Sequence, residues 1–259
     1  MSGSSRPILE GSPLGGSKDV RLTSRLVREM FDAVAPRYDF LNHFLSAGLD
    51  LSWRRHIAEA LREPLSKPGC VALDVCCGTG DLAFALARFS SSSAQVIGSD
   101  FCQPMLTRAR SKLVRNTARG LPAAVGLVGA DTLSLPLGDA SVDVITSGFG
   151  FRNLADYKLG ITEIGRVLKP GGSLAILEFS QVQWPVFGPL FRLYFAHILP
   201  KLGTWISGVA GPYQYLHESA ARFPDQEAFT LLLSQSGFSA IRYQNFMGGI
   251  AALHTAQKQ

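Results

Sequence analysis

Apolar and polar residues follow a helical pattern in the first quarter of the chain. Between residues 21 and 61 the apolar positions recur at helical spacing, so we expect helices there. Pro36 interrupts the pattern, which favours two or more helices over one. Residues 1–20 are rich in Ser, Gly and Pro, as is typical of a flexible tail. The sequence therefore predicts a tail at 1–20 and a helical cap at 21–65.

From residue 71 onward, short apolar runs alternate with helical patterns. The apolar runs predict buried strands at 71–75, 94–100, 123–131, 143–149 and 173–179. Helical patterns follow at 81–89, 103–114 and 155–172, the last of which is ended by Pro170 and Gly171. Strands that are apolar throughout and separated by helices predict an α/β fold with a parallel sheet covered on both faces.

The last third of the chain departs from this alternation. Residues 184–210 are aromatic and apolar on nearly all sides, which indicates a segment buried between core and cap. We expect an apolar helical insertion at 184–222. A helix and two strands should follow Pro224, with the second strand at 248–256. Residues 21–259 are therefore expected to form a single domain.

Composition and charge narrow the class of protein. The net charge is +5 and the pI is near 9.2, but the basic residues are scattered, so we expect no nucleic-acid partner. No apolar stretch is long enough for a membrane span, and the N-terminus lacks the apolar region of a signal peptide. These features predict a cytoplasmic protein.

The four cysteines are Cys70, Cys76, Cys77 and Cys102. They lack the C-x-x-C spacing of a zinc site, so no metal is expected. Their number is also too small for the disulfide framework of a secreted scaffold. We expect all four to be reduced thiols.

A glycine-rich turn joins the first predicted strand to its helix. Within the segment Asp74–Leu82, Gly78 and Gly80 let the backbone turn sharply and leave room for a ligand against the main chain. Asp100 ends the next strand, where a carboxylate can accept both hydroxyl groups of a ribose. Together these features predict an adenosine site at the carboxyl edge of the sheet.

The charge pattern of this turn favours S-adenosylmethionine over a dinucleotide. A dinucleotide site has a third glycine, where this chain has Ala83, and Asp81 would repel a pyrophosphate. S-adenosylmethionine has no phosphate, and Asp74 would favour its sulfonium and ammonium groups. The segment Ala130-Asp131-Thr132 could receive the adenine amino edge, although alone it is more typical of an ordinary Asx turn.

Longer stretches of the chain match a known family. The matching segments are Phe31–Asn42, Leu45-Ser46, Gly48, Trp53-Arg54, Asp74–Asp81, Phe149–Asn153, Arg166–Gly172, Leu177–Ser180, Tyr213–Leu216, Phe223–Gln226 and Ala251–His254. With them the chain resembles the quinone-biosynthesis C-methyltransferases, which methylate demethylmenaquinone or 2-methoxy-6-polyprenyl-1,4-benzoquinol. The stretches VAPRYDFLN, GFGFRN and LEFS are the most particular to that family. The resemblance covers nearly the whole chain after the tail.

This resemblance implies a class I methyltransferase fold of Rossmann-like type, with a seven-stranded, mostly parallel sheet whose last strand is antiparallel. It implies S-adenosylmethionine as cofactor and S-adenosylhomocysteine as product, with contacts at Thr79, Asp100, Asp131 and Thr132. Many relatives have a serine where this chain has Gly148, which offers no side chain for such a contact. The full set of candidate cofactor-binding residues is Asp74, Gly78, Thr79, Gly80, Asp100, Phe101, Asp131, Thr132 and Gly148.

The same resemblance implies a lipophilic polyprenyl quinol substrate. Methylation of an aromatic carbon needs an electron-rich ring, and we expect Arg152 and Asn153 to orient and stabilise its phenolate while Tyr38 closes over the ring. Arginine is a poor proton acceptor, so electrostatic activation is its expected role. Alternatively, Arg152 only bridges the sheet end.

Other titratable residues are expected to be structural. Glu178 is expected to anchor the cap. Lone histidines are more often structural than catalytic, and this applies to His197, His217 and His254.

Several alternatives stay open at this point. The ring could be a naphthoquinol or a benzoquinol, and the segment between Trp184 and Trp205 could line a prenyl channel, contact the inner face of the membrane peripherally or form a buried helix. An exposed apolar cap would favour a homodimer. Rival functions are methylation of RNA or another small aromatic molecule, NAD-linked oxidoreduction, and a non-catalytic module that binds the cofactor.

Overall fold

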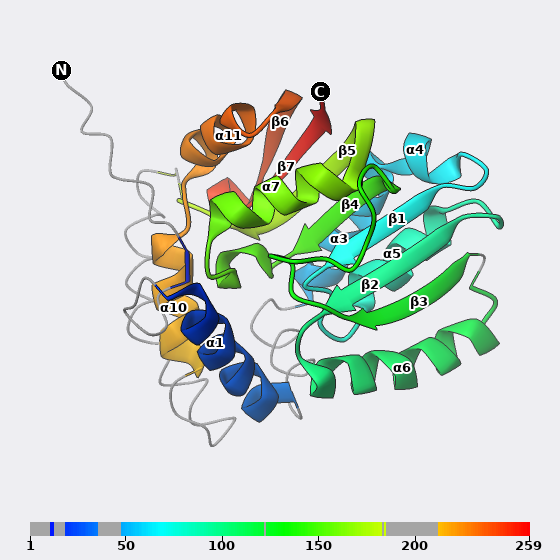
Figure 1. Cartoon of the computed structure of the whole chain (residues 1–259), viewed down its shortest axis with the longest axis horizontal. Coiled ribbons are helices and arrows are strands. Elements are labelled where there is room, and N and C mark those ends of the chain that lie inside the picture. The colour runs from blue at the N-terminus through cyan, green and yellow to red at the C-terminus, as the bar shows by residue number, and fades with distance from the viewer. Residues whose placement is uncertain (1–10, 13–18, 36–47, 122, 183, 185–211) are drawn as a thin grey trace.

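A seven-stranded sheet forms the centre of the molecule (Figure 1). The computed structural model describes residues 11–12, 19–35, 48–121, 123–182, 184 and 212–259. The strand order is β3-β2-β1-β4-β5-β7-β6. The strands are β1 (Val71–Val75), β2 (Gln95–Asp100), β3 (Ala124–Gly129), β4 (Val142–Gly148), β5 (Leu168–Phe179), β6 (Phe238–Phe246) and β7 (Ala251–Lys258).

Strand direction matches the sheet that the resemblance implies. The first five strands pair in parallel, whereas β7 runs antiparallel to both β5 and β6. Asp74 of β1 lies between Gly98 of β2 and Thr146 of β4. The carboxyl ends of these strands therefore meet at one edge, and the predicted fold class is confirmed.

Helices cover both faces of the sheet (Figure 1). On one face, α3 (Leu49–Ala60), α4 (Arg62–Ser66) and α5 (Asp81–Phe89) bury Trp53, Ile57 and Leu86 against the strands. On the other face lie α7 (Tyr157–Val167) and α11 (Gln226–Gln235). The remaining elements are α1 (Val20–Val34), α6 (Gln103–Ala118), α10 (Pro212–Arg222) and the 3-10 turns η2 (Phe151–Asn153) and η4 (Met247–Gly249).

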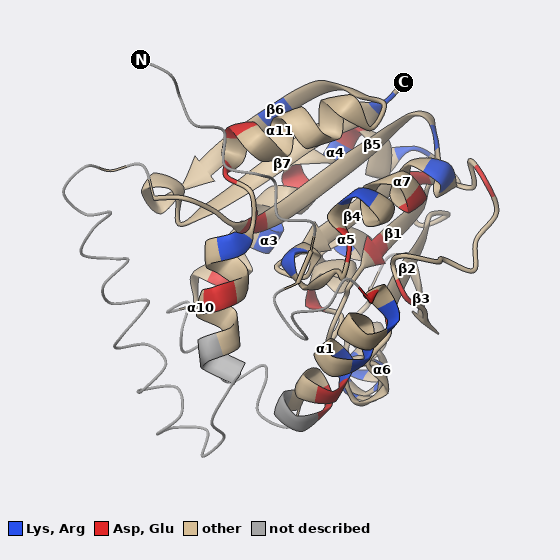
Figure 2. Ribbon diagram, turned by 60° about the vertical axis from the view of Figure 1, so that its left-hand side comes forward, with Lys and Arg blue, Asp and Glu red and all other residues tan. Residues whose placement is uncertain are grey.

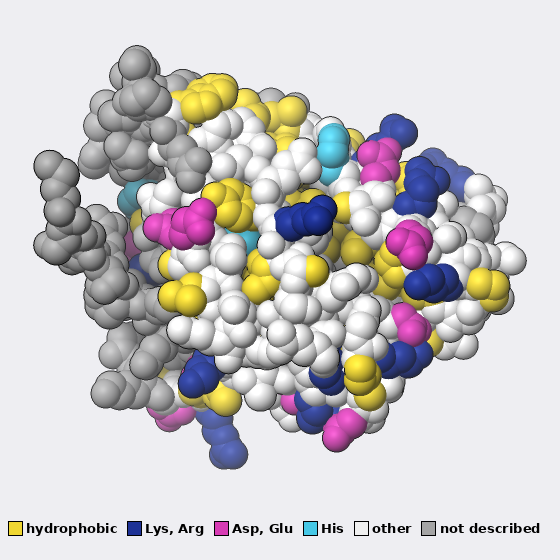
Figure 3. Space-filling view, turned by 90° about the horizontal axis from the view of Figure 1, so that it is seen from above, with side chains coloured by type: hydrophobic (Ala, Val, Ile, Leu, Met, Phe, Trp, Pro, Cys, Tyr) yellow, Lys and Arg dark blue, Asp and Glu magenta, His cyan; other side chains and the backbone are white. Residues whose placement is uncertain are grey.

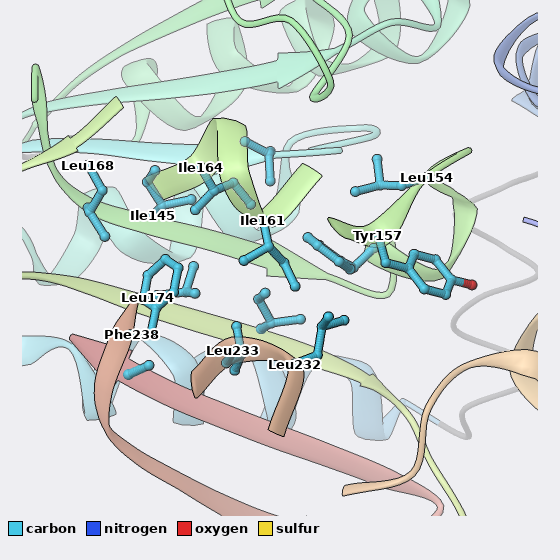
Figure 4. Packing of buried hydrophobic residues seen from close by; sticks show 14 of the residues in the cluster. Ile145, Leu154, Tyr157, Ile161, Ile164, Leu168, Leu174, Leu232, Leu233 and Phe238 are labelled. Atoms are coloured by element: carbon cyan, nitrogen blue, oxygen red, sulfur yellow. The ribbon is translucent and has the colours of Figure 1, made fainter. Parts of the chain in front are cut away.

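The larger core cluster lies between the sheet and α7 with α11 (Figure 4). Ile161 and Ile164 of α7 pack with Leu233 of α11 against Ile145 and Leu174 of the sheet. Each of these side chains is almost completely buried, and such burial contributes roughly 1.5–3 kcal/mol per large aliphatic residue. This core fixes the sheet edge at which the candidate residues meet.

One predicted helix boundary is wrong. The helix expected at 155–172 begins at Tyr157, where Asp156 accepts a hydrogen bond from the Leu159 amide at 2.9 Å, and it ends at Val167. Leu168 is already part of β5 and pairs with Val142 of β4. Pro170 disfavours helical conformation in the residue before it, and the buried side chain of Leu168 gains more from the sheet.

The first described segments pack against the rest of the domain. Asp19 caps α1 by accepting hydrogen bonds from the Arg21 and Leu22 amides. Phe31 of α1 packs against the cluster that contains Met105 of α6, and the last turn of α1 lies near the first turn of α6 in Figure 1. Within the predicted tail, the Ser12 amide donates to the Leu154 carbonyl at 2.8 Å. The domain boundaries at residues 20, 65, 184 and 222 stay predictions.

Charged side chains are distributed over the described surface. Lys and Arg lie among Asp and Glu in both views, and the face in Figure 3 shows the two signs interspersed (Figure 2, Figure 3). Arg55 pairs with Glu59, and Arg166 pairs with Asp139 and Glu163. In the described part of the chain, no helix combines the length and hydrophobicity needed to cross a membrane.

Candidate cofactor and active site

Two pockets adjoin each other at the carboxyl edge of the sheet, where they share Cys76 and Gly78. The larger one is lined by Ser24, Phe31, Cys76, Gly78, Asp100, Phe101, Met105, Ala130, Asp131, Thr132, Phe149, Gly150, Asn153, Leu154 and Ala155. The smaller, more polar one is lined by Arg54, Asp74, Cys76, Cys77, Gly78, Thr79, Asp81, Leu82 and Gly148. Most of the residues predicted from the sequence therefore come together at one place.

The glycine-rich turn is held by close backbone contacts. Gly80 has a φ of 84°, a conformation that favours glycine, and a Cβ atom there would lie 2.9 Å from the Phe84 ring. Gly150 comes so close to Cys76 that any side chain at position 150 would collide with it. These glycines bring the β1 turn against the segment that follows β4, which creates the wall between the two pockets.

Asp100 fixes the turn and faces the larger pocket. Its two carboxylate oxygens accept hydrogen bonds from the Gly78 and Cys102 amides, each at 2.8 Å. Burial raises the pKa of this carboxyl, while the backbone amides oppose the rise. Carboxylate oxygens have further lone pairs, so Asp100 can still accept from a ribose, as predicted.

Asp74 lies at the boundary of the smaller pocket and is 1% exposed. Its Oδ1 accepts a hydrogen bond from the Thr146 hydroxyl at 2.9 Å, while its Oδ2 is buried and has no hydrogen-bond partner among the described residues. Burial raises the pKa of Asp74 to about 7, an effect that Thr146 and Arg54 partly offset. A carboxyl in this state is suited to receive a cationic group from a ligand.

Asp131 and Thr132 line the larger pocket just after β3 ends at Gly129. Asp131 Oδ1 accepts from the Leu133 amide at 3.0 Å, which is the Asx turn considered as an alternative from the sequence. Asp131 therefore forms the Asx turn and also lines the pocket, because this hydrogen bond orients its segment along the pocket wall. Phe101 lines the same pocket, and the Arg28 guanidinium lies 5.3 Å from the centre of its ring.

Thr79 belongs to a charged network beside the smaller pocket. Lys112 of α6 donates to Thr79 Oγ1 and to Asp81 Oδ1, both at 2.8 Å. Arg54 of α3 binds Asp50 at 2.7 Å and lies 3.5 Å from Asp81. These contacts hold α3, α5 and α6 together around the turn.

Of the candidate catalytic residues that the structure describes, Asn153 lines the larger pocket. It lies in η2, directly after β4, and its Oδ1 accepts a hydrogen bond from the Tyr215 hydroxyl at 2.8 Å. The same hydroxyl lies 3.0 Å from Ser12 Oγ. Asn153 is therefore oriented by α10 as well as by its own turn.

Arg152 is buried behind that turn and lines neither pocket. Its guanidinium binds Glu178 of β5 at 2.8 Å, donates to the Phe149 carbonyl and lies over the Phe179 ring. Glu178 also accepts from the Arg152 amide at 3.1 Å. The described contacts match the bridge across the sheet end that the sequence left as an alternative.

The remaining candidates are placed as follows. Gly80 shapes the turn without lining a pocket, Gly148 lines the smaller pocket through its backbone, and Tyr38 lies outside the described residues. His254 is buried, its Nε2 lies 3.0 Å from the Gln226 carbonyl, and burial lowers its pKa. It takes no part in either pocket. Among the described residues, no cluster of His, Cys, Asp or Glu is arranged to hold a metal ion.

Sequence reasoning missed Arg54, Tyr215, Ser24 and Phe31 as pocket or supporting residues. Arg54 and Tyr215 stand in the Trp53-Arg54 and Tyr213–Leu216 segments, which were noticed only as parts of a resemblance. Their contacts join residues far apart in the chain, and local pattern gives no sign of such proximity.

Comparison with known proteins gives consistent matches. Residues 17–258 match the model of the ubiE/COQ5 methyltransferase family. The chain is 41% identical over 259 residues to a demethylmenaquinone methyltransferase of Deinococcus radiodurans, covering 100% of both chains. It is 44% identical to that of Thermus thermophilus, covering 88% of this chain and 100% of the relative. It is 39% identical to the ubiquinone/menaquinone biosynthesis C-methyltransferase UbiE of Brucella anthropi, covering 90% and 87%.

Solved structures support the fold independently. A SAM-dependent methyltransferase from Aquifex aeolicus superposes with a TM-score of 0.56 at 21% identity, covering 78% of this chain and 88% of that one. At this identity the likeness concerns the fold alone.

Proposed function

We propose, since the chain belongs to the ubiE/COQ5 methyltransferase family, that it transfers a methyl group from S-adenosylmethionine to a ring carbon of a polyprenylated quinol. One observation carries the proposal: the acidic residues that end β1 and β2 and the turn with Asn153 border two adjoining pockets. A cofactor and an acceptor ring can therefore meet at one sheet edge. This placement is what a direct methyl transfer requires.

The described residues fit the cofactor. When bound, S-adenosylmethionine supplies an electrophilic methyl group and leaves as S-adenosylhomocysteine. Asp100 would hold the ribose, Asp131 and Thr132 the adenine edge, and Phe101 the face of the base. Asp74, with its buried Oδ2, would favour the cationic methionyl end. Gly78, Thr79 and Gly148 would border that end.

Asn153 is proposed to act on the acceptor ring. A quinol is most nucleophilic at carbon once its hydroxyl has lost a proton, and a phenolate is stabilised by hydrogen-bond donors. Tyr215 engages the Oδ1 of Asn153, which leaves the amide N–H groups to donate to the ring oxygen. Phe31 and Phe149 supply apolar walls on the same pocket and exclude water from it.

Arg152 is proposed as a positioning residue. Its buried ion pair with Glu178 holds η2 against the end of β5, and thereby holds Asn153 at the pocket. Glu178 neutralises the guanidinium charge, so we assign Arg152 no direct contact with the ring. Tyr38 is proposed, from the family resemblance alone, to close over the ring.

The substrate is proposed to be demethylmenaquinol, since the relatives from Deinococcus radiodurans and Thermus thermophilus are both named demethylmenaquinone methyltransferase. A benzoquinol precursor of ubiquinone is the second candidate, favoured by the name of the Brucella anthropi relative.

A polyprenyl quinol resides in a lipid bilayer, so we propose that the enzyme works from the cytoplasm and contacts the inner face of the membrane. Trp184 and Met247 support this, because both are about half exposed, and Trp184 packs beside Gly248. A homodimer remains a prediction.

The Asn153→Ala variant tests the proposed chemistry. We expect kcat to fall by about 10²–10³-fold, the loss typical of removing one donor to a developing oxyanion. The dissociation constant for adenosylhomocysteine should change less than about threefold. Asn116→Ala, on α6 and outside both pockets, is the control and should leave both quantities unchanged. Equal losses of turnover and cofactor affinity in Asn153→Ala would contradict the assignment.

A further inference from the structure

Gly11 and Ser12 lie against the turn that carries Asn153, although they are distant from it in the sequence. The Ser12 amide donates a hydrogen bond to the Leu154 carbonyl at 2.8 Å. A Cβ atom on Gly11 would collide with the carbonyl group of Ala155, so this close backbone approach favours glycine. Leu154 and Ala155 both line the larger pocket. The segment ahead of α1 therefore supports the wall of that pocket.

Ser12, Tyr215 and Asn153 form a chain of hydrogen bonds that ends at the larger pocket. The Tyr215 hydroxyl donates to Asn153 Oδ1 at 2.8 Å and lies 3.0 Å from Ser12 Oγ. Tyr215 and Asn153 are 6% and 9% exposed, so water has little access to the contact between them. The chain thus joins three parts of the fold that are distant in the sequence: the segment ahead of α1, helix α10 and the turn η2.

The protonation of Tyr215 gives this chain a direction. Burial raises the pKa of Tyr215 to about 12, so its hydroxyl keeps its proton near neutral pH. A phenolic hydroxyl has one proton to donate, and Tyr215 donates it to Asn153 Oδ1. Tyr215 therefore accepts from the Ser12 hydroxyl. Ser12 donates to Tyr215, and Tyr215 donates to Asn153.

This direction determines what the Asn153 amide can offer to a ligand. With Oδ1 engaged by Tyr215, the two N–H groups on Nδ2 are available as donors. A flipped amide would exchange the two atoms and offer an oxygen, which would repel a phenolate oxygen instead of stabilising it. The hydrogen bond from Ser12 opposes the flip, because it directs the Tyr215 proton toward Asn153.

We propose that Ser12 and Tyr215 are positioning residues for methyl transfer, which keep the N–H groups of Asn153 available to the acceptor oxygen. This inference rests on the proposed function, because it assumes that Asn153 acts on the acceptor ring. It makes Gly11 and Ser12, for which the sequence predicted a flexible tail, part of the support of the active site.

Conservative variants separate positioning from a general effect on the fold. Tyr215→Phe removes one hydroxyl and keeps the ring, Ser12→Ala removes the other hydroxyl, and Ser12→Thr restores it. Tyr243→Phe is the matched control, because the Tyr243 hydroxyl donates to exposed Glu227 at 2.7 Å and lines neither pocket. For each purified protein, kcat for methyl transfer to reduced demethylmenaquinol and the Kd of adenosylhomocysteine are measured.

The two hydroxyl groups should affect turnover and leave cofactor binding intact. We expect kcat to fall about tenfold in Tyr215→Phe and about threefold in Ser12→Ala, in keeping with the loss of one hydrogen bond. Ser12→Thr should recover most of the loss, and Tyr243→Phe should match wild type. The Kd of adenosylhomocysteine should change less than about twofold in all of these variants, because neither hydroxyl lines a pocket.

A double-mutant cycle gives a result that a merely structural role would not produce. If Tyr215 acts through Asn153, Tyr215→Phe should lower kcat less than about twofold in protein that already carries Asn153→Ala. The full loss in that background, a wild-type kcat in either Tyr215→Phe or Ser12→Ala, or an equal loss of cofactor affinity would overturn the inference. Wild-type protein that transfers no methyl group would overturn the proposed function as well.

Discussion

Asp74 provides a buried carboxyl group in the wall of the smaller pocket. Burial raises its pKa to about 7, so the group changes charge close to neutral pH. The sequence indicated a favourable charge for a sulfonium and ammonium ligand at this position. It could not indicate the raised pKa, because the burial comes from strands and helices distant in the chain.

The raised pKa predicts two opposite pH effects. The folded state binds the Asp74 proton more tightly than the unfolded state, so this group's contribution to stability is lost as pH rises from about 4 through about 7. A ligand ammonium prefers the ionised form. Affinity for adenosylhomocysteine should therefore rise up to about tenfold between pH 6 and pH 8.

The Asp74→Asn variant isolates both effects, since it removes the titration while an amide oxygen can still accept from Thr146. Urea unfolding across pH should show that wild type loses stability relative to Asp74→Asn as pH rises, and the variant's ligand affinity should stay flat. A wild-type affinity independent of pH would count against an ionising Asp74 at the ligand.

At the scale of elements, the turn between β1 and α5 depends on the backbone freedom of Gly80. We expect Gly80→Ala to destabilise the fold by about 2–3 kcal/mol, since it combines left-handed strain with contact against the Phe84 ring. Gly120 provides a control with a similar φ of 80° and no atom within 4 Å of the added Cβ. Gly120→Ala should cost about 1 kcal/mol.

Urea denaturation of the two variants measures the difference directly. Gly80→Ala should lose roughly 1–2 kcal/mol more than Gly120→Ala, because only its Cβ meets a neighbouring ring. If both variants lost the same free energy of unfolding, the Phe84 ring would move aside at no energetic cost. The close packing of α5 on the turn would then not contribute to stability.

Most elements could be predicted because each has a local signal. The strand at 71–75 agrees with β1 at both ends, and the strand and turn around Asp100 were also placed correctly. The predicted end of α7 was wrong, because Leu168 pairs with Val142 of β4. The sequence around Leu168 gives no sign of that pairing. The contact between Tyr215 and Asn153 was missed for the same reason, because it joins α10 to η2 across 62 residues.

For the molecule as a whole, the proposed membrane contact gives a separate prediction. Wild-type protein should float with vesicles of anionic phospholipid, and the double variant Trp184→Ser with Met247→Ser should lose at least about half of that association. Val114→Ser is the control, because Val114 is the most exposed of the large apolar side chains described and lies on α6. Equal flotation of all three proteins would show that Trp184 and Met247 do not contribute to membrane contact.

Methyl transfer to a ring carbon can be followed with a labelled cofactor. Purified protein is incubated with methyl-labelled S-adenosylmethionine and reduced demethylmenaquinol, and the lipid product is analysed for the position of the label. We expect the label in a new methyl group on a ring carbon, together with one equivalent of adenosylhomocysteine. Folded protein that binds adenosylhomocysteine but transfers no methyl group to a naphthoquinol or benzoquinol ring would contradict the proposed reaction.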